Sequence, residues 1–424
     1  MAETELITSA PVQEGKRIET LDVIRGFAML GILVPNIVAF SWPQMAMSET
    51  KVFGMTLDLL GTGPANDSAN ALGHFVTQSF FHGKMMFLFA LLFGAGVVMY
   101  SRKFDNPDRL VPLRVGAGLW YRRMAWLLAI GLTHAVFLWF GDILVWYAAS
   151  GLGLVWWLRR LKPMTQILIA VPCYLFGTAI LLGVTAIGAH VHSSGSFDLF
   201  STIPSEVQAY TGSYLEALVA RLWTLVQLYV FSGPLFSVSI TGIMLAGIAL
   251  TRLGVLTGER SNRFYAALAF GGLVLGLGLT GLVISGFNAA NIDFAGMYFS
   301  VIGQLVGIPT SLGYAAVLIL LVRNNLLGFL TKALAAVGRM ALSNYLMQTL
   351  ICTTLFYGYG FGLFARIQYP HLWLVVAGVW AVNITFSVLW LRVFQFGPLE
   401  WVWRSLTYWK VIPLRRTRSG LHAG

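Results

Sequence analysis

Four ionisable side chains lie inside or at the edge of stretches that are otherwise apolar enough to cross a membrane. Arg25 lies at the start of the first apolar run, and Lys84 lies inside the second. His134 lies inside the third, eight positions before Asp142. Charged or titratable groups are costly in hydrocarbon, so in such segments they are rare and mark a function by default. The four residues therefore predict a polar site inside a helical bundle.

His134 is the side chain in this set that best suits proton transfer, because an imidazole can gain and lose a proton near neutral pH. A carboxylate such as Asp142 can orient the ring, as in nucleophile–base–orienter sets. Eight residues span roughly 12 Å along a helix axis, so a direct hydrogen bond requires the chain to fold back. The alternatives are a structural histidine bonded to a neighbouring helix and, for Asp142, an N-cap of the following helix.

The other polar residues form a series ordered by depth. At 1.5 Å per residue, His134 lies roughly 15 Å into its run and Lys84 lies in the outer half of its own. Asn36 lies near the middle of the first run, with Arg25 near its inner end. Snorkelling or a structural ion pair is the alternative for Lys84. The histidines outside the third run match no metal-ligand spacing with supporting carboxylates, so we predict no metal site.

Basic residues at the inner end of the third run allow two interpretations. Arg122 and Arg123 are most simply anchors at the inner leaflet. The sharper interpretation is that they form an anion site for phosphates together with Arg25. Arg25 itself stands three positions after Asp22, so those two could be only a local ion pair.

Membrane-spanning helices must position these residues. The chain of 424 residues is 57% hydrophobic and 11% charged, whereas a soluble chain carries about a quarter charged residues. Apolar stretches of about 20 residues recur along the whole length, which predicts an all-α polytopic membrane protein. We expect about ten spans, at residues 23–42, 73–100, 124–140, 143–158, 164–189, 230–250, 264–286, 298–322, 340–360 and 372–394.

Lys and Arg gather in the loops of one predicted side, which places both termini in the cytoplasm. The formal net charge of +11 therefore indicates topology and contact with anionic lipid, not nucleic acid. The expected organisation is a cytoplasmic segment 1–22 without the features of a cleaved signal peptide, a single bundle 23–394, and an interfacial amphipathic helix with a basic tail over 395–424.

Two longer loops are expected on the outer side, near 43–72 and 190–221, because both are rich in Gly, Ser, Asn and Asp. The stretch 214–231 that follows the second loop mixes charged and apolar residues. It is compatible with an interfacial helix on the outer leaflet and with the first half of a broken sixth span.

Five ordered blocks carry a family resemblance. They are RIETLDVIRGFAMLGI at 17–32 followed by Asn36, GKMMFLFALLFGAG at 83–96, GLTH through FGDIL at 131–144, VGRMALSNYLMQT at 337–349, and GPLEWVWR at 397–404. Together they resemble the YeiB family of bacterial inner-membrane proteins. That family is similar to a wider group of membrane acyltransferases, which includes the heparan-α-glucosaminide N-acetyltransferases. The resemblance implies a multi-pass inner-membrane protein that performs a histidine-assisted acyl transfer from cytosolic acyl-CoA.

The expected function is therefore a membrane acyltransferase in which His134 deprotonates an acceptor hydroxyl or amine and Asp142 supports the charged imidazole. Phosphates of acyl-CoA, a co-substrate and not a tightly bound cofactor, are expected at Arg25, Arg122 and Arg123. The expected oxyanion or acceptor-site residues are Lys84 and Asn36.

The alternative is a transporter or exporter of a small metabolite or lipid-linked species. In that case the same Lys84, His134 and Asp142 form a proton relay or a substrate site. A membrane scaffold or sensor is a third possibility. Membrane lipids are the expected partners, with a small-molecule or glycan acceptor in the acyltransferase hypothesis, and a homo-oligomer stays open.

Overall fold

The computed structural model describes residues 19–47, 56, 67–102, 104–105, 113–195, 201–229, 233–289 and 295–416. Most of the predicted cytoplasmic segment 1–22, most of the predicted loop 43–72 and the end of the predicted basic tail lie outside these residues. Within the described residues, all regular secondary structure is helical except one isolated bridge between Phe394 and Arg415.

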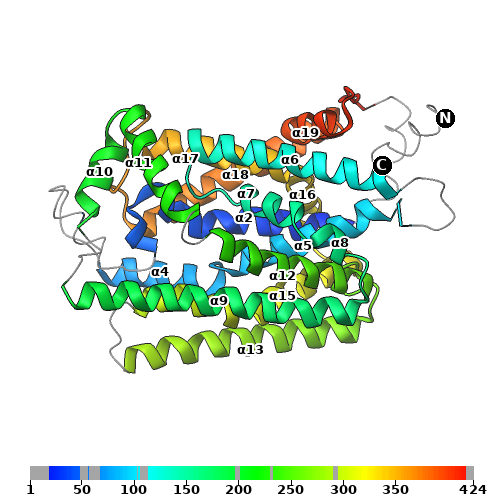
Figure 1. The fold of residues 1–424 in the computed structure, drawn as a ribbon, viewed down its shortest axis with the longest axis horizontal. Coiled ribbons are helices and arrows are strands. Elements are labelled where there is room, and N and C mark those ends of the chain that lie inside the picture. The colour runs from blue at the N-terminus through cyan, green and yellow to red at the C-terminus, as the bar shows by residue number, and fades with distance from the viewer. Residues whose placement is uncertain are drawn as a thin grey trace.

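The helices follow the chain in the order drawn in Figure 1. They are α2 (Glu19–Ser41), the 3-10 turn η2 (Gln44–Met47), α4 (Asp67–Phe80), α5 (Lys84–Ser101), α6 (Leu113–Phe137), α7 (Leu144–Leu152), α8 (Val155–Leu158), α9 (Pro163–Ser193), α10 (Ile203–Thr211), α11 (Tyr214–Gln227), α12 (Gly233–Arg252), α13 (Asn262–Ala289), α14 (Ala295–Val306), α15 (Ile308–Arg323), α16 (Gly328–Arg339), α17 (Ala341–Phe356), α18 (Tyr369–Val393) and α19 (Pro398–Tyr408).

Several of these helices are long and apolar enough to cross a membrane. Among the described residues there are five such helices, or six if the bent pair α14–α15 forms one span. The prediction of an all-helical, polytopic membrane protein is therefore confirmed. The larger number of about ten spans and the cytoplasmic position of the termini stay predictions.

Two of the predicted spans each contain two consecutive helices, of which only the α14–α15 pair is sharply bent. The span predicted at 73–100 consists of α4 and α5, and Gly83 between them has φ +73°, a conformation that glycine adopts without steric cost. The span predicted at 298–322 consists of α14 and α15, bent by 49° at Gly307. Pro309 in the first turn of α15 suits a helix start, because its missing N–H has no helical partner there.

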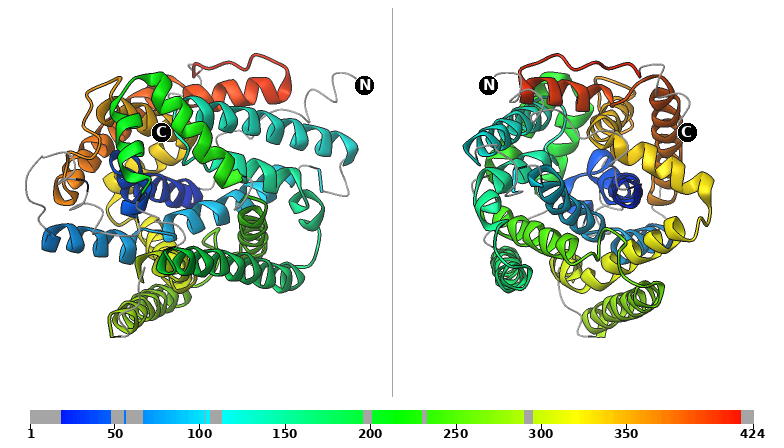
Figure 2. Two further views of the ribbon diagram at one scale, coloured as in Figure 1. Left: turned by 60° about the vertical axis from the view of Figure 1, so that its left-hand side comes forward. Right: turned by 90° about the vertical axis from the view of Figure 1, so that its right-hand side faces the viewer.

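Helix α2 occupies the centre of the bundle. In the end-on view of Figure 2 its dark blue ribbon is surrounded by the other helices. In this helix, 83% of an apolar stretch of 18 residues is buried inside the protein. Glycines permit this packing: a Cβ on Gly26 would lie 1.9 Å from the Leu334 carbonyl oxygen, and one on Gly338 would lie 2.0 Å from the Asp22 carbonyl oxygen. Helices α2 and α16 therefore cross at backbone contact, as small residues allow in membrane bundles.

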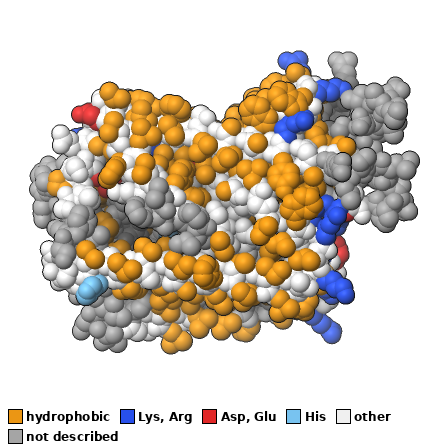
Figure 3. Space-filling model, in the orientation of Figure 1, with side chains coloured by type: hydrophobic (Ala, Val, Ile, Leu, Met, Phe, Trp, Pro, Cys, Tyr) orange, Lys and Arg blue, Asp and Glu red, His pale blue; other side chains and the backbone are white. Residues whose placement is uncertain are grey.

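The outer helices α9 and α13 are apolar, but in each of them only 22% of an apolar stretch of 18 residues is buried inside the protein. Their exposed residues include Leu168, Phe176, Phe270 and Leu282. Figure 3 shows hydrophobic side chains spread along this face, while Lys and Arg gather at the right-hand end. A surface of this kind is suited to lipid along its length and to water or headgroups at its ends.

The stretch predicted as either interfacial or half-spanning forms a separate helix, α11. A capping box starts it, since the Ser213 hydroxyl accepts from the Glu216 N–H and the Glu216 carboxylate accepts from the Ser213 N–H. Arg221 on its buried face donates to the Val136 carbonyl at the end of α6, with a distance of 2.9 Å. Trp223 is 66% exposed on the opposite face. This amphipathic character favours the interfacial interpretation.

Candidate functional site

The chain reverses direction between α6 and α7. At the end of α6, the backbone N–H groups of Leu138 and Trp139 both donate to the His134 carbonyl. Helix α7 then returns along α6, and a Cβ on Gly131 would lie 2.8 Å from the Val145 nitrogen and 3.0 Å from an Asp142 carboxylate oxygen. A glycine at 131 therefore makes room for the returning segment, and the reversal brings Asp142 beside His134.

His134 and Asp142 form a direct, buried hydrogen bond. The distance from His134 Nδ1 to Asp142 Oδ2 is 2.7 Å, and both side chains have 0% exposure. The other carboxylate oxygen, Oδ1, accepts from the Val145 N–H at 2.8 Å, near the start of α7. Asp142 therefore serves as a helix cap and as the partner of the imidazole at the same time.

Thr349 on α17 completes a chain of hydrogen bonds. Its hydroxyl lies 2.9 Å from His134 Nε2, although the two residues are 215 positions apart. Because the Asp142 carboxylate accepts the proton on Nδ1, a neutral imidazole presents its lone pair at Nε2, and the Thr349 hydroxyl donates to it. We did not predict this residue. The signal that could have found it is a hydroxyl in the apolar block that also contains Asn344 and Gln348.

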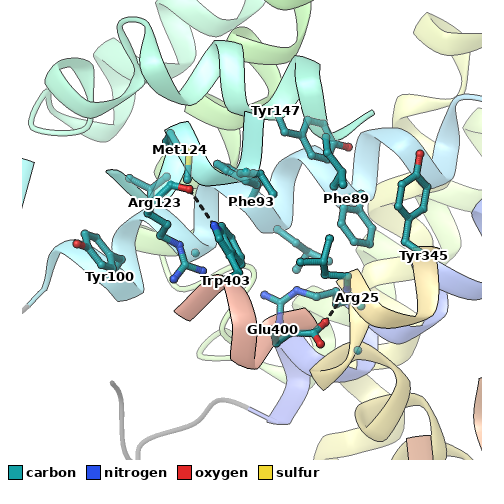
Figure 4. A pocket seen from close by; sticks show the side chains of 18 of the residues that line it. Arg25, Phe89, Phe93, Tyr100, Arg123, Met124, Tyr147, Tyr345, Glu400 and Trp403 are labelled. Carbon is teal, nitrogen blue, oxygen red and sulfur yellow. Dashed lines mark hydrogen bonds between the residues drawn. The ribbon is translucent and has the colours of Figure 1, made fainter. Parts of the chain in front are cut away.

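A cavity of about 290 Å³ lies on the other side of Tyr345. Its wall is largely apolar and aromatic, with Phe89, Phe93 and Tyr147 among the lining residues (Figure 4). The Tyr345 hydroxyl donates to the Gly141 carbonyl and accepts from the Ile143 N–H, both at 3.3 Å. The Tyr345 ring also lies 5.0 Å from the His134 ring, between centroids. Tyr345 is therefore in contact with the cavity and with the His134 set.

Guanidinium groups line the same cavity away from Tyr345. In Figure 4, Arg123 and Arg25 point toward the space between Tyr100 and Phe89, and the lining also contains two further arginines, Arg339 and Arg404. The Arg123 guanidinium stacks 3.8 Å from the centroid of the Trp403 ring, and the Trp403 indole N–H donates to the Arg123 carbonyl at 2.8 Å. These contacts hold positive charge at one end of an apolar cavity, as recognition of an anionic head with an apolar tail requires.

Glu400 fixes α19 to the beginning of α17. Its carboxylate accepts from the N–H groups of Leu342 and Ser343 at 2.7 and 3.1 Å, and from the Ser343 hydroxyl at 2.5 Å. Burial raises the pKa of the Glu400 carboxyl, and the hydrogen bonds from Ser343 oppose that rise. A carboxylate at a helix N-terminus is favourable, so α19 holds the helix that bears Tyr345 and Thr349.

A second set of polar side chains holds α17 against α18 and α2. The Asn344 amide donates to the Ser387 hydroxyl at 2.8 Å and accepts from the Asn383 amide at 3.0 Å. Gln348 donates to Asn383 at 3.1 Å and to the Met29 carbonyl at 3.2 Å. All four side chains are buried. A fully bonded network of this kind makes the position of α17 specific.

The structure separates some of the residues that we predicted to act together. Arg122 is not among the cavity-lining residues: it donates to the Thr407 carbonyl at 3.3 Å and lies over the Trp409 ring. Lys84 donates to the Gln78 carbonyl at 2.7 Å and is likewise outside the cavity lining. Asn36 is half-buried on α2 and does not line the cavity either.

The other predicted site residues form two separate groups. His134 and Asp142 are bonded to each other but do not line the cavity, whereas Arg25 and Arg123 do line it. Arg25 also donates to the Asp22 carboxylate at 2.9 Å, so the local ion pair is present as well. Within the described residues, no three His, Cys, Asp or Glu side chains are grouped so that they could hold a metal ion. The absence of a metal stays a prediction.

Two known proteins match this chain over almost its whole length, and a family model matches its C-terminal part. The model of the DUF418 family, a protein of unknown function, matches residues 250–410, which include α17, α18 and α19. YxaH of Bacillus subtilis (strain 168) is 32% identical over 429 residues, covering 96% of this chain and 98% of YxaH. YeiB of Escherichia coli (strain K12) is 34% identical over 402 residues, covering 92% of this chain and 95% of YeiB. Both relatives are described as uncharacterized proteins. No solved structure matches.

Proposed function

The chain belongs to the same family as YeiB and YxaH, and its residues 250–410 match the DUF418 model; we propose that it is an acyltransferase of the bacterial inner membrane. It takes an acyl group from cytosolic acyl-CoA and transfers it to an acceptor hydroxyl or amine within or across the membrane. One observation carries the proposal: the bonded pair of His134 and Asp142 lies beside Tyr345, and Tyr345 lines a cavity that is also lined by Arg25 and Arg123.

The cavity suits the thioester arm of acyl-CoA. Its volume of about 290 Å³ is close to the lower limit, roughly 300 Å³, for small-molecule pockets. It would therefore hold the acyl group and part of the pantetheine arm, with the nucleotide outside. Arg25 and Arg123 supply positive charge for the phosphates. The apolar lining favours an acyl chain over a free polar metabolite.

His134 acts as the general base in this proposal. Its imidazole takes the proton of the acceptor, and the acceptor attacks the thioester carbonyl. Asp142 stabilises the imidazolium that forms and keeps the ring in one tautomer. The same proton is then delivered to the leaving thiolate, so that one residue serves both halves of the reaction.

The proposal includes ten crossings with both termini in the cytoplasm. The Lys and Arg side chains that gather at one end of the face in Figure 3 support this orientation. The arginines of the cavity belong to the inner ends of the predicted first and third spans and to α16 and α19. With this orientation, the arginine end of the cavity is accessible to a cytosolic nucleotide.

Binding of acyl-CoA to the purified protein tests the proposal, with two adjacent arginines as a matched pair. Arg123→Ala should weaken binding about 10- to 100-fold, because it removes a charged contact to phosphate. Arg122→Ala should bind like the wild type, since that side chain lies outside the cavity lining. Calorimetry measures both. A folded wild-type protein that binds no acyl-CoA, or equal losses in the two variants, would contradict the proposal.

Transport is the second candidate function, and the bent pair α14–α15 is the observation that favours it. Broken helices are common in secondary transporters, and the side chain of Lys84 packs against Gly307 at the bend. Lys84, His134 and Asp142 would then act in proton relay or substrate binding. Proton movement into proteoliposomes that requires His134 but not acyl-CoA would favour transport over acyl transfer.

A further inference from the structure

The buried hydroxyl of Thr349 has no role in the reaction proposed above. His134 bridges Asp142 Oδ2 at 2.7 Å and Thr349 Oγ1 at 2.9 Å. Counted over whole residues, backbone included, the exposed fraction is 1% for His134, 3% for Asp142 and 1% for Thr349. A hydroxyl, an imidazole and a carboxylate bonded in that order form the arrangement that activates a nucleophile. From this arrangement we propose that Thr349 accepts the acyl group as a covalent ester, an inference that rests on the proposed function.

The alternative role for the Thr349 hydroxyl is a hydrogen bond to the backbone of its own helix. Threonines in helices commonly bond back to the carbonyl four residues earlier. Among the described residues such bonds measure 2.7–3.0 Å at eight other threonines: Thr133, Thr178, Thr185, Thr211, Thr241, Thr251, Thr280 and Thr407. For Thr349 the distance to the Tyr345 carbonyl is 3.4 Å. The hydroxyl is therefore turned from the helix backbone toward His134, which is the orientation that proton transfer to Nε2 requires.

The burial of the three residues also argues for a covalent intermediate. Direct attack of the acceptor on the thioester requires both substrates in this buried site together, whereas an ester on Thr349 lets them use the site in turn. Tyr345 stands one helical turn before Thr349, contacts the His134 ring and lines the cavity, so the thioester reaches Thr349 only if the Tyr345 side chain moves.

The two half-reactions balance. In the first, Thr349 Oγ1 bonds to the thioester carbonyl carbon, its proton passes to His134 Nε2, and the carbon–sulfur bond breaks. The leaving thiolate takes that proton and departs as the free thiol of CoA. In the second, an acceptor hydroxyl or amine attacks the ester and gives its proton to His134. The ester bond then breaks, and His134 returns a proton to Thr349 Oγ1.

The test is acylation of the full-length purified protein by acetyl-CoA without any acceptor, measured by intact mass and peptide mapping. The wild type and Thr349→Ser should each gain one acetyl group, mapped to position 349. Thr349→Val keeps the shape but lacks the hydroxyl, so its label should fall to background while its affinity for acetyl-CoA is unchanged. Thr353→Val is the matched control, because Thr353 is also buried on α17 but is not bonded to His134; it should be labelled like the wild type.

Each other outcome overturns a defined part of the idea. Acetyl-CoA binding without any label, or with a label on His134, overturns the ester on Thr349 and leaves the proposed function standing. A Thr349→Val protein that is still labelled, or that transfers to an added acceptor at the wild-type rate, overturns it as well. If the folded wild type binds no acyl-CoA at all, the proposed function and this inference fall together.

Discussion

Lys84 and His134 are both titratable and both 1% exposed, yet their surroundings differ. The Lys84 ammonium donates to a single backbone carbonyl, that of Gln78 in the preceding helix. His134 is bonded at both ring nitrogens to side chains, one of them 215 residues away. The bond to a backbone carbonyl holds the Lys84 ammonium in place, whereas an imidazole between a carboxylate and a hydroxyl has a possible proton-transfer partner at each ring nitrogen.

Burial alone does not distinguish the role of Lys84 from that of His134. The cost of a charged group in hydrocarbon marks both positions equally. What distinguishes them is the chemical type of their partners and the contact between the His134 ring and Tyr345 at the cavity wall. We infer that His134 takes part in the reaction and that Lys84 has a structural role, and the following variants test that difference.

Replacement of His134 should have the largest effect. His134→Asn removes the general base, and we expect the transfer rate from acyl-CoA to fall about 10²- to 10⁴-fold. The rate is measured as thiol release from acyl-CoA in the presence of an acceptor mixture. Thermal unfolding serves as the control for folding, and a variant that is stable and fully active would remove His134 from the mechanism.

Asp142→Asn should come next. Asparagine can still accept from the Val145 N–H, so α7 keeps its cap and the melting temperature should change little. It cannot hold the imidazole in the required tautomer, and transfer should fall about 100-fold or more. If the variant loses stability without losing activity per folded molecule, Asp142 is only a helix cap.

Lys84→Met should leave the transfer rate within about twofold of the wild type, because Lys84 touches neither His134 nor the cavity lining in the described contacts. Methionine removes the cost of burying the ammonium but also removes the donor to the Gln78 carbonyl, so we expect only a small change in the melting temperature. Rate and melting temperature are measured together. A large loss of rate at unchanged stability would place Lys84 in the chemistry and end the distinction.

Glu206 on α10 extends the comparison to a carboxylate outside the spans, and its effect should be the smallest. Burial raises the pKa of Glu206 to about 7, and the hydrogen bond from the Gln44 N–H opposes the rise. The folded protein therefore holds this proton more tightly than the unfolded chain does. The stability that it contributes is present below about pH 4.5 and is lost as the pH rises toward 7.

Glu206→Gln should remove this part of the pH dependence. Between pH 5 and 7.5 the melting temperature of the wild type should fall by a few degrees, about 2–4 °C, relative to that of the variant. Differential scanning calorimetry in one detergent measures both curves. Parallel curves would show that Glu206 titrates alike in the folded and unfolded chain.

Composition and the pattern of apolar runs predict a helical membrane protein and single out His134 and Asp142. They do not predict the bond between these two, because eight positions on a straight helix keep them apart and only the reversal after Phe137 joins them. The bond between His134 and Thr349 is even harder to predict from the sequence, because the two residues lie on different helices that are far apart in the chain. Arg122 and Arg123 are neighbours in sequence, but successive side chains on a helix point in directions about 100° apart, so only packing decides which one faces the cavity.

The central position of α2 has a consequence for biogenesis. As the first helix described, it leaves the ribosome early, yet it crosses α16 at backbone contact through Gly26 and Gly338. Until α16 is synthesised, the face of α2 that contains Gly26 lacks its partner helix and stays in contact with lipid or with the insertion machinery. The bundle therefore closes around its first helix only when the last quarter of the chain arrives, and a chain that stops before residue 328 leaves α2 without the surface that it is shaped to meet.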